Sequence, residues 1–357
     1  MAVIVFKDTD YKYGFHVTKQ STLTKTVQRV ISTMPFTAFQ TCIANPRGKN
    51  IPQFDVNDVI KARKLLEENE VYMCVHGSLL YNLAGSVTHR DDPCFSRKCE
   101  STCSALTGEL DVCAGLGCGV VVHIGACKKR KEGIVTIGKL IENVLTRNSK
   151  ASNELAKGLG ISIEEFKKRR KIILENAAGE GNKIGSTLED IREIIKEIPD
   201  KLKSQVKVCI DTAHAFGAGI YNWGVPKEVK HFYKDFDKIV GLEYLEVFHL
   251  NDSRQSKKKA NNAYYGSRKD RHENLGLGHI FHDVHDDPNE PDIPYHHGSD
   301  GLKEFLLQAY KRKIPIIGEP PQKTDEGGEG PGGLRDWQYV CDLLLHTKYP
   351  LIKEVEF

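Results

Sequence analysis

The regular alternation of short apolar runs with helical patterns constrains this fold more than any other feature of the sequence. Eight such runs recur along the chain, and a stretch with helical spacing of apolar residues follows each one. The runs are Tyr11–Val17, Phe36–Ala44, Val71–His76, Gly119–Ile124, Lys171–Glu175, Val206–Asp211, Leu245–His249 and Ile314–Glu319. No G-x-G-x-x-G or P-loop sequence directly follows any of these runs. The alternation predicts an α/β fold with a single (β/α)8 TIM barrel, and a doubly wound parallel sheet is the alternative.

The composition is that of a globular protein with a large core. Of the 357 residues, 39% are hydrophobic and 28% are charged, and this length suits one large barrel or two average domains. We assign residues 1–357 to one barrel domain. The 51 basic and 48 acidic residues leave a net charge of only +3, so an argument for a nucleic-acid partner must depend on local charge.

The sequence carries no signal for export or for a membrane partner. Its apolar runs are shorter than the ~20 residues that span a bilayer, and the N-terminal apolar stretch is too short for a signal peptide. Ten scattered cysteines are typical of a reducing compartment, and the five between Cys94 and Cys118 contain no C-x-x-C pair. We expect those five to be idle thiols, with a disulfide or a metal site as alternatives. We expect an intracellular, monomeric protein, in the cytoplasm or the nucleus.

Ionisable side chains end six of the predicted strands. They are His76, His123, Glu175, Asp211, His249 and Glu319, and His214 follows three residues after Asp211. In a barrel of parallel strands, these ends meet at one mouth. One such histidine is more often a buried polar residue than a ligand, but six strands with this feature indicate a site. Imidazoles mixed with carboxylates suit Zn²⁺, with Mn²⁺ as the alternative.

The polar segment after Leu245–His249 contributes two further candidate ligands. Asp270 and His272 have a D-x-H spacing that lets both side chains reach one ion from a loop. Together with the strand-end residues they make nine potential ligands, which exceeds the ~4–5 that one zinc ion takes. Three ions that share one bridging carboxylate would use all nine.

Seven segments, taken in order, resemble the endonuclease IV family of zinc-dependent apurinic/apyrimidinic endonucleases in base-excision repair. They are HGSLLYNLA (76–84), HIGA (123–126), ENAAGEG (175–181), CIDTAHAFGAG (209–219), FHLNDS (248–253), DRHENLGLGHI (270–280) and GEPP (318–321). The resemblance extends from about residue 12 to residue 345. Departures from the family pattern predict insertions near residues 90–100, 128–160 and 281–298.

The resemblance implies that three Zn²⁺ ions share the nine ligands, with Mn²⁺ as a possible substitute. His76, His123 and Glu175 would hold the first ion; Glu175, Asp211, His249 and Glu319 the second; His214, Asp270 and His272 the third. It also implies hydrolysis of the phosphodiester 5′ to an abasic site in double-stranded DNA, which leaves a 3′-hydroxyl and a 5′-deoxyribose phosphate. Removal of blocked 3′ ends and 3′→5′ exonuclease action are further possibilities in this family.

Two carboxylates are the predicted catalytic residues. The ions would activate water and neutralise charge in the transition state, so no side-chain nucleophile is needed. Glu175 would act as the bridging ligand. Glu319 could orient the attacking water in addition to binding metal, and a ligand role alone is the alternative.

The family also uses two loops to fill the gap left by the displaced abasic nucleotide. Arg47, in an N-P-R context, is the predicted insertion residue of the first loop, with an ordinary exposed arginine as the alternative. In the second loop the predicted DNA-binding residues are Leu79, Leu80 and Tyr81, and the tyrosine stands one position later than in the bacterial pattern. Candidate phosphate contacts, or simply solvated charges, are the basic clusters Lys128–Lys131, Lys257–Lys259 and Arg268–Lys269.

Two other functions stay open at this point. A divalent-metal sugar isomerase or epimerase on a related barrel would also carry Glu, Asp and His at its strand ends. Arg47 and the third ligand set disfavour that function. The other alternative is a catalytically inactive, metal-containing DNA-binding protein, which the complete ligand set disfavours. Sensitivity of DNA cleavage to chelators would discriminate among the three.

Overall fold

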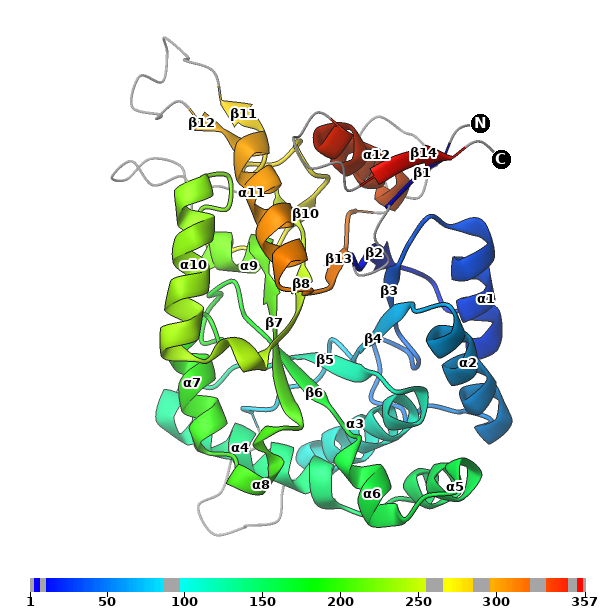
Figure 1. Cartoon of the computed structure of the whole chain (residues 1–357). Helices are drawn as coiled ribbons and strands as arrows, with labels where there is room; N and C mark the ends of the chain where they lie inside the picture. Colours follow the sequence, from blue (N-terminus) through cyan, green and yellow to red (C-terminus); the bar gives the residue numbers. More distant parts are fainter. Residues whose placement is uncertain are drawn as a thin grey trace.

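The computed structural model describes residues 3–6, 11–85, 97–254, 266–284, 296–321, 332–345 and 352–355 of the chain. At its centre is a closed barrel of parallel strands in the order β13-β2-β3-β4-β5-β6-β7-β8 (Figure 1). These strands are β2 (Tyr13–His16), β3 (Ala38–Thr41), β4 (Tyr72–His76), β5 (Gly119–His123), β6 (Ile172–Glu175), β7 (Val206–Asp211), β8 (Leu245–His249) and β13 (Ile316–Gly318). The predicted TIM barrel is confirmed.

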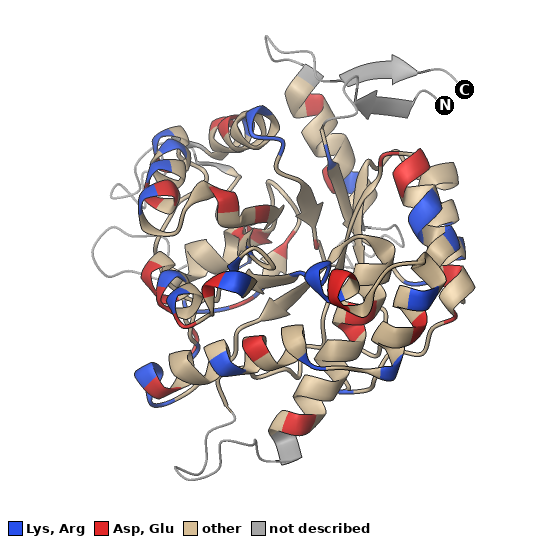
Figure 2. Cartoon of the chain, turned by 60° about the horizontal axis from the view of Figure 1, so that its bottom comes forward, with Lys and Arg blue, Asp and Glu red and all other residues tan. Residues whose placement is uncertain are grey.

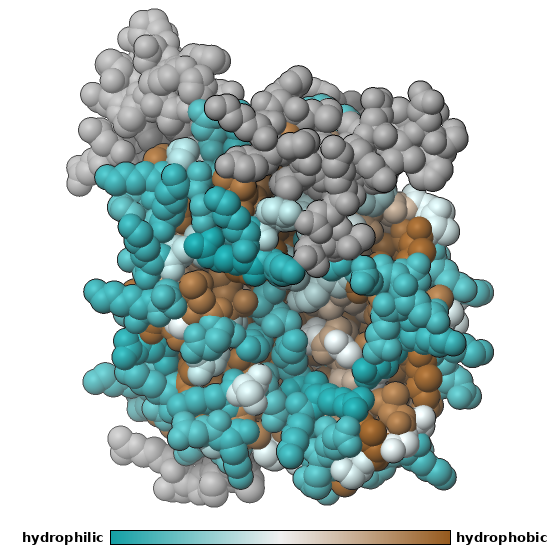
Figure 3. Space-filling view, viewed as in Figure 1, coloured by the Kyte–Doolittle hydropathy of each residue, from teal (hydrophilic) through white to brown (hydrophobic). Residues whose placement is uncertain are grey.

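Helices follow the strands and surround the barrel (Figure 1). They are α1 (Leu23–Thr33), α2 (Val56–Glu68), α3 (Arg97–Leu116), α4 (Arg130–Thr146), α5 (Lys150–Leu159), α6 (Ile163–Lys168), α7 (Leu188–Lys196), α8 (Asp200–Lys203), α9 (Thr212–Ala218), α10 (Pro226–Ile239), α11 (Gly298–Lys311) and α12 (Gly332–Leu345). Basic and acidic residues are interspersed on several of these helices (Figure 2), and hydrophilic side chains cover much of the face seen in Figure 3. Among the described residues, none of the helices has the length and hydrophobicity of a membrane span.

Local sequence signals explain where several helices begin and end. The sequence over 187–202 predicts one helix with charges of alternating sign. The structure divides it into α7 and α8 at Pro199, which has no backbone N–H to continue the helical hydrogen bonds. The polar stretch 148–160 contains α5, which a capping box of Ser149 and Ser152 begins. Gly160 ends it with φ of 68°, a conformation that favours glycine.

The glycine and alanine residues that follow Val206–Asp211 predict a loop after this strand. The segment is instead the helix α9, so this prediction is wrong. In α9 the Asp211 carboxylate caps the first turn by accepting the backbone N–H of His214 at 2.8 Å. Small residues dominate this segment, so it lacks the apolar periodicity from which a helix is predicted. The sequence also did not predict three short antiparallel pairs: β1 (Val3–Phe6) with β14 (Ile352–Val355), β9 (Asp252–Ser253) with β10 (His272–Glu273), and β11 (Asp283–Val284) with β12 (His296–His297).

Buried thiols occupy much of the cysteine-rich stretch. Cys99, Cys103, Cys113 and Cys118 are buried and form no disulfide. The structure therefore shows buried thiols at these four positions, while Cys94 lies outside the described residues.

A buried arginine joins three helices on one side of the barrel. Arg170 and Asp111 are both fully buried, and the Arg170 Nη2 and Asp111 Oδ1 atoms are 2.7 Å apart. Arg170 Nη1 also donates to the carbonyl oxygens of Val144, Leu145 and Arg147 at the end of α4. The second Asp111 oxygen accepts the hydroxyl of Ser149, the N-cap of α5. One ion pair therefore satisfies polar groups of α3, α4 and α5.

A buried carboxyl on α12 gives a testable dependence of stability on pH. Burial raises the pKa of Asp336 from 3.8 to about 7, against the hydrogen bonds from Asn274 and from the backbone of Leu275. The folded chain therefore holds this proton more tightly than the unfolded chain, and stability falls as pH rises through that interval, by up to about 4 kcal/mol. Asp336→Asn keeps an oxygen for both donors and is expected to reduce this loss, measured by urea unfolding at pH 5 and pH 8.

Asp342→Asn is the matched control, because Asp342 lies exposed on the same helix. An equal pH dependence in wild type and Asp336→Asn would contradict the expected role of Asp336.

Candidate metal centre

The pleat of the barrel places the predicted strand-end residues in one layer. Alternate residues of a strand face the same side. A fully buried apolar layer inside the barrel consists of Ala38, Cys74, Val121, Ile173, Cys209, Val247 and Ile317. Two positions further along the same strands stand Gln40, His76, His123, Glu175, Asp211, His249 and Glu319. The polar layer at the mouth is therefore built directly on an apolar floor.

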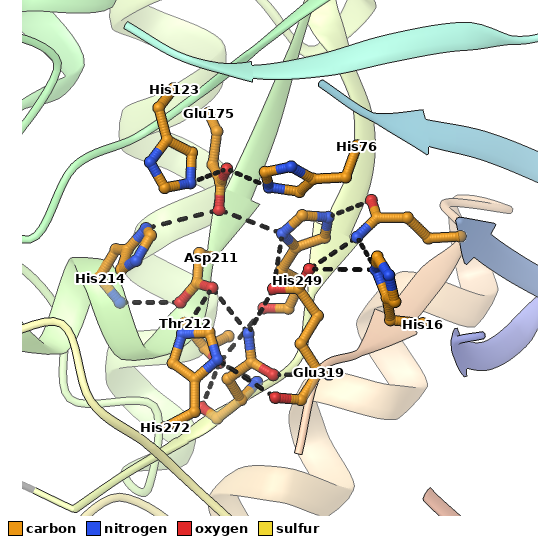
Figure 4. A network of polar contacts seen from close by, with 12 residues as sticks. His16, His76, His123, Glu175, Asp211, Thr212, His214, His249, His272 and Glu319 are labelled. Atoms are coloured by element: carbon orange, nitrogen blue, oxygen red, sulfur yellow. Dashed lines mark hydrogen bonds and ion pairs between the residues drawn. The ribbon is translucent and has the colours of Figure 1, made fainter. Parts of the chain in front are cut away.

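Glu175 lies at the centre of this polar layer (Figure 4). It is 1% exposed, and its Oε2 atom is 3.1 Å from His123 Nε2 and 3.5 Å from His76 Nε2. Its other oxygen, Oε1, is 3.1 Å from His249 Nδ1 and 3.5 Å from His214 Nδ1. The two oxygens thus face two different groups of histidines, as a bridging carboxylate would.

A second group forms where β6, β7, β8 and β13 end. His249 Nδ1 is 3.3 Å from Glu319 Oε2 and close to Glu175. Asn251 lies between the other two carboxylates, since its Nδ2 donates to Asp211 Oδ2 at 2.7 Å and to Glu319 Oε2 at 3.3 Å. Ligand atoms of Glu175, Asp211, His249 and Glu319 all lie within 4.8 Å of one another.

The third group combines α9 with the segment around β10. His214 Nε2 is 3.2 Å from Asp270 Oδ2, and His272 Nε2 is 3.5 Å from Asp270 Oδ1. His272 Nε2 is also 3.5 Å from Asp211 Oδ2. Asp211, His214 and His272 lie within 4.8 Å of one another, so Asp211 stands between the second and third groups. All nine predicted ligands therefore converge on one mouth.

Hydrogen bonds fix which ring nitrogen of four histidines faces the centre. The Nδ1 atoms of His76, His214 and His272 lie 2.8, 2.9 and 3.2 Å from the carbonyl oxygens of Gly77, Asn176 and Glu319. A carbonyl accepts only from N–H, so Nε2 is the nitrogen of these rings that can offer a lone pair to a metal ion. His249 is reversed, because its Nε2 lies 2.9 Å from Gln40 Oε1 and leaves Nδ1 facing Glu175.

These residues fit transition-metal ions. Among the described residues, the buried atoms Glu175 Oε2, His214 Nε2 and His272 Nε2 have charged groups 3.1–3.5 Å away but form no hydrogen bond of good geometry. A buried polar atom without a partner is costly, and a cation would satisfy all three. The donor set of imidazole and carboxylate suits Zn²⁺ or Mn²⁺. The chain thus has three residue groups able to bind metal.

The electrostatics of the cluster also call for bound cations. Burial opposes the charge of His76, but the Glu175 and Glu319 carboxylates outweigh it and raise the pKa of His76 to about 9. Burial likewise opposes the charge of Glu319, but His249 and His76 hold the pKa of that carboxyl at about 2. The nearby carboxylates likewise raise the pKa of His214 and His249, so without metal these two histidines and His76 hold protons that balance the carboxylates. Metal binding must displace these protons and is therefore favoured by a rise in pH.

Two amide side chains complete the polar layer and were missed in the sequence. Gln40 and Asn251 are buried and contact Glu319 from two sides. A signal was present for Gln40, because a polar residue two positions after the inward-facing Ala38 must face the barrel interior. Asn251 lies within the FHLNDS segment, two residues after the strand-end histidine, where no pattern distinguishes it from an ordinary loop residue.

The two predicted DNA-contacting loops lie against each other. Ser78 Oγ donates to the carbonyl oxygens of Pro46 and Gly48, and the backbone N–H of Leu79 also donates to Pro46. Arg47 is exposed, and Leu79 and Leu80 are each 51% exposed. Exposed leucines on such paired loops are suited to contact with a partner.

Tyr81 occupies a different position from the two leucines. It is 4% exposed, and its hydroxyl donates to Glu109 Oε2 at 2.9 Å. In this conformation the ring anchors the loop from beneath and does not present its face to solvent.

A cavity of about 370 Å³ adjoins the predicted ligands. It is lined by His123, Glu175, His214, Leu80 and Lys183 among others. A larger cavity of about 660 Å³ lies at the opposite end of the barrel, and none of the predicted site residues lines it.

Comparisons with known proteins agree with this geometry. A family model described as xylose isomerase-like TIM barrel matches residues 29–287. The apurinic-apyrimidinic endonuclease 1 of Saccharomyces cerevisiae is 29% identical over 332 residues, covering 92% of this chain and 76% of the yeast protein. A probable endonuclease 4 of Nitrosopumilus maritimus is 30% identical over 316 residues, covering 87% of this chain and 94% of that protein. The crystal structure of endonuclease IV from Thermus thermophilus superposes with a TM-score of 0.62 at 23% identity, covering 94% and 100% of the two chains, which supports the fold.

The matched family model and the closed barrel define this chain as a xylose isomerase-like TIM barrel protein. Within that class, the identity to probable endonuclease 4 over nearly its whole length shows that the chain belongs to the endonuclease IV family. The resemblance seen in the seven sequence segments is thereby confirmed.

Proposed function

We propose that this chain is a DNA-repair apurinic/apyrimidinic endonuclease that hydrolyses the phosphodiester 5′ to an abasic site in duplex DNA. The products would be a 3′-hydroxyl and a 5′-deoxyribose phosphate. As a family member the chain is a hydrolytic enzyme, and its relatives are named endonuclease 4 and apurinic-apyrimidinic endonuclease. The observation that carries the proposal is the convergence of nine imidazole and carboxylate ligands, centred on buried Glu175. We further propose that the enzyme acts as an intracellular monomer.

Each ligand group has a separate task in this proposal. One Zn²⁺ is assigned to His76, His123 and Glu175, a second to Glu175, Asp211, His249 and Glu319, and a third to His214, Asp270 and His272. When bound, the ions supply activation of water and neutralisation of phosphate charge. The chain's own contribution is orientation, since hydrogen bonds to backbone carbonyls hold His76, His214 and His272 in one tautomer each.

The paired loops supply the proposed recognition of damaged DNA. The exposed leucines would occupy the gap beside the displaced abasic nucleotide, with Arg47 approaching from the neighbouring loop. Loss of a base lowers the cost of unstacking, so this contact favours abasic over intact DNA.

Incision of a duplex that carries one synthetic abasic site tests the proposal. Zinc-loaded protein is expected to cut 5′ to the abasic site, and prolonged chelation is expected to abolish the cut. Re-addition of Zn²⁺ should restore it. A metal-loaded protein that leaves the duplex intact but isomerises or epimerises a sugar would overturn the proposal in favour of the sugar-converting alternative.

Replacing the exposed leucines is expected to weaken selection of damaged DNA without removing metal. For Leu79→Ser combined with Leu80→Ser we expect a roughly 10-fold loss of kcat/KM on abasic duplex, about 1.4 kcal/mol, because apolar area no longer fills the gap. The metal content should stay that of wild type.

Val135→Ser is the control, since Val135 is a similarly exposed apolar residue on α4. Equal kcat/KM for the leucine variant and this control would exclude a role of the two leucines in recognition.

A further inference from the structure

Gln40 belongs to the polar layer at the barrel mouth, although its side chain is a neutral amide and not a carboxylate or an imidazole. It stands on β3 two residues after Ala38 of the apolar floor, as His76 and Glu175 stand two residues after Cys74 and Ile173. The Gln40 side chain is fully buried at the base of the ligand groups. A buried amide at this depth is costly unless its polar atoms are satisfied, so its contacts define its role.

Every hydrogen-bonding position of the Gln40 amide is occupied. Its Nε2 donates to Glu319 Oε1 at 2.6 Å and also lies 3.2 Å from His16 Nδ1. Its Oε1 lies 2.9 Å from His249 Nε2 and accepts the thiol of Cys74 at 3.4 Å. The amide thus uses both N–H groups and both lone pairs.

This arrangement admits one orientation of the amide. The Glu319 carboxylate requires a donor, so the NH₂ group must face it. The oxygen is then left for His249, whose Nε2 must carry a hydrogen. Nδ1 is therefore the nitrogen that faces Glu175 and Glu319 and becomes available to a metal ion when its own proton leaves. A flipped amide would place its oxygen 2.6 Å from Glu319 Oε1, and two acceptors repel each other at that distance.

We propose that Gln40 is a positioning residue for the group Glu175, Asp211, His249 and Glu319, where it fixes the tautomer of His249 and the rotamer of Glu319. The inference depends on the metal-binding role proposed above for these residues. Gln40 touches two of the four ligands in this group. Its effect should therefore concentrate on the metal position that those two ligands share.

Asn251 holds the other oxygen of Glu319, with Nδ2 3.3 Å from Oε2. Glu319 is therefore clamped between two neutral amides and cannot rotate while both are present. Removal of Gln40 frees the Oε1 side and also releases the His249 ring to adopt either tautomer. The predicted result is selective weakening of one metal position.

The test is zinc content after equilibration with graded chelator. Wild type, Gln40→Met, Gln40→Glu and Thr41→Val are loaded with Zn²⁺, dialysed and assayed for zinc per chain. Gln40→Met is expected to release one equivalent of Zn²⁺ at a chelator concentration about 10–100-fold lower than wild type requires. Loss of a residue that hydrogen-bonds a metal ligand lowers metal affinity by about this factor. The other zinc equivalents of this variant should be released at the same chelator concentration as those of wild type.

Thr41→Val is the matched control. Thr41 is equally buried on the same strand, faces the other side, and loses its hydrogen bond to the carbonyl of Val17 on substitution. Its zinc release should follow wild type. Unfolding of the metal-free proteins should be alike for Thr41→Val and Gln40→Met, which removes general loosening of β3 as a cause.

Gln40→Glu separates orientation from packing. It keeps the shape of the side chain and an oxygen for His249, but sets a second carboxylate against Glu319. We expect larger zinc loss than in Gln40→Met, and with Co²⁺ as a probe, a changed visible absorption band for one equivalent only. The inference would be overturned if Gln40→Glu released zinc at the same chelator concentration as wild type. It would also be overturned if Gln40→Met released all of its zinc at one lowered chelator concentration.

Incision of abasic duplex is measured on the same samples, so that two failures can be told apart. Selective zinc loss in Gln40→Met together with no incision by wild type leaves the positioning role standing and rejects the endonuclease. Incision by wild type with unchanged zinc release in Gln40→Met rejects the positioning role and retains the endonuclease.

Discussion

Glu175→Gln is expected to abolish incision of abasic duplex, with a fall in kcat of at least about 10³-fold. Glu175 is buried, and its two oxygens face histidines of two different groups. Glutamine keeps the shape but replaces one oxygen with a donor and removes the negative charge that both groups share. Zinc content should therefore drop in the same variant, and the incision assay combined with metal analysis measures both effects.

Glu246→Gln is the matched control, because Glu246 is a carboxylate of β8 at the opposite end of the barrel. Its Oε1 is 2.6 Å from Lys171 Nζ, and the pair is partly exposed. Incision and zinc content of this variant should equal those of wild type. Activity within tenfold of wild type in Glu175→Gln would show that Glu175 does not bridge ions.

Arg170→Met is expected to destabilise the fold by about 3–5 kcal/mol. The substitution leaves the fully buried Asp111 without its cation, and it removes the donor shared by the carbonyl oxygens of Val144, Leu145 and Arg147. Burial already raises the pKa of Asp111 against the effect of Arg170, so this carboxylate is costly even when paired. Urea unfolding of metal-loaded protein at neutral pH measures the change.

Two comparisons make the Arg170 result specific. The double variant Arg170→Met, Asp111→Leu should recover at least half of the lost stability, because no unpaired charge stays buried. Arg169→Met should change stability by less than about 1 kcal/mol, since Arg169 pairs with Glu165 at the surface. A loss in Arg169→Met as large as in Arg170→Met would contradict the structural role assigned to the buried pair.

The barrel could be predicted because each of its strands corresponds to a contiguous apolar run in the sequence that ends in a polar residue. The same property made the ligands visible, since strand ends of a parallel barrel meet at one mouth. The helix α9 was missed because the small residues of Thr212–Ala218 carry no apolar periodicity and the Asp211 cap begins the helix. The position of that cap depends on the tertiary structure, since Asp211 also belongs to the polar layer at the barrel mouth.

Contacts between loops, and the orientation of individual side chains, could not be predicted from the sequence. Tyr81 could not be distinguished from Leu79 and Leu80 by type, and only its bond to Glu109 shows that it turns inward. Gln40 was overlooked for a related reason. An isolated glutamine on a strand has no motif, and its importance appears only when Glu319, 279 residues away in the chain, is seen at its side.

The predicted metal ligands at the mouth come from two structurally different parts of the molecule. The ligands two residues above the apolar floor are placed by the strands, so their spacing is as rigid as the barrel wall. His214, Asp270 and His272 belong to α9 and to the segment around β10, outside that wall. The first two proposed metal positions would thus depend on the barrel strands themselves, whereas the third proposed position would depend on a helix and a loop segment whose sequences can vary more freely.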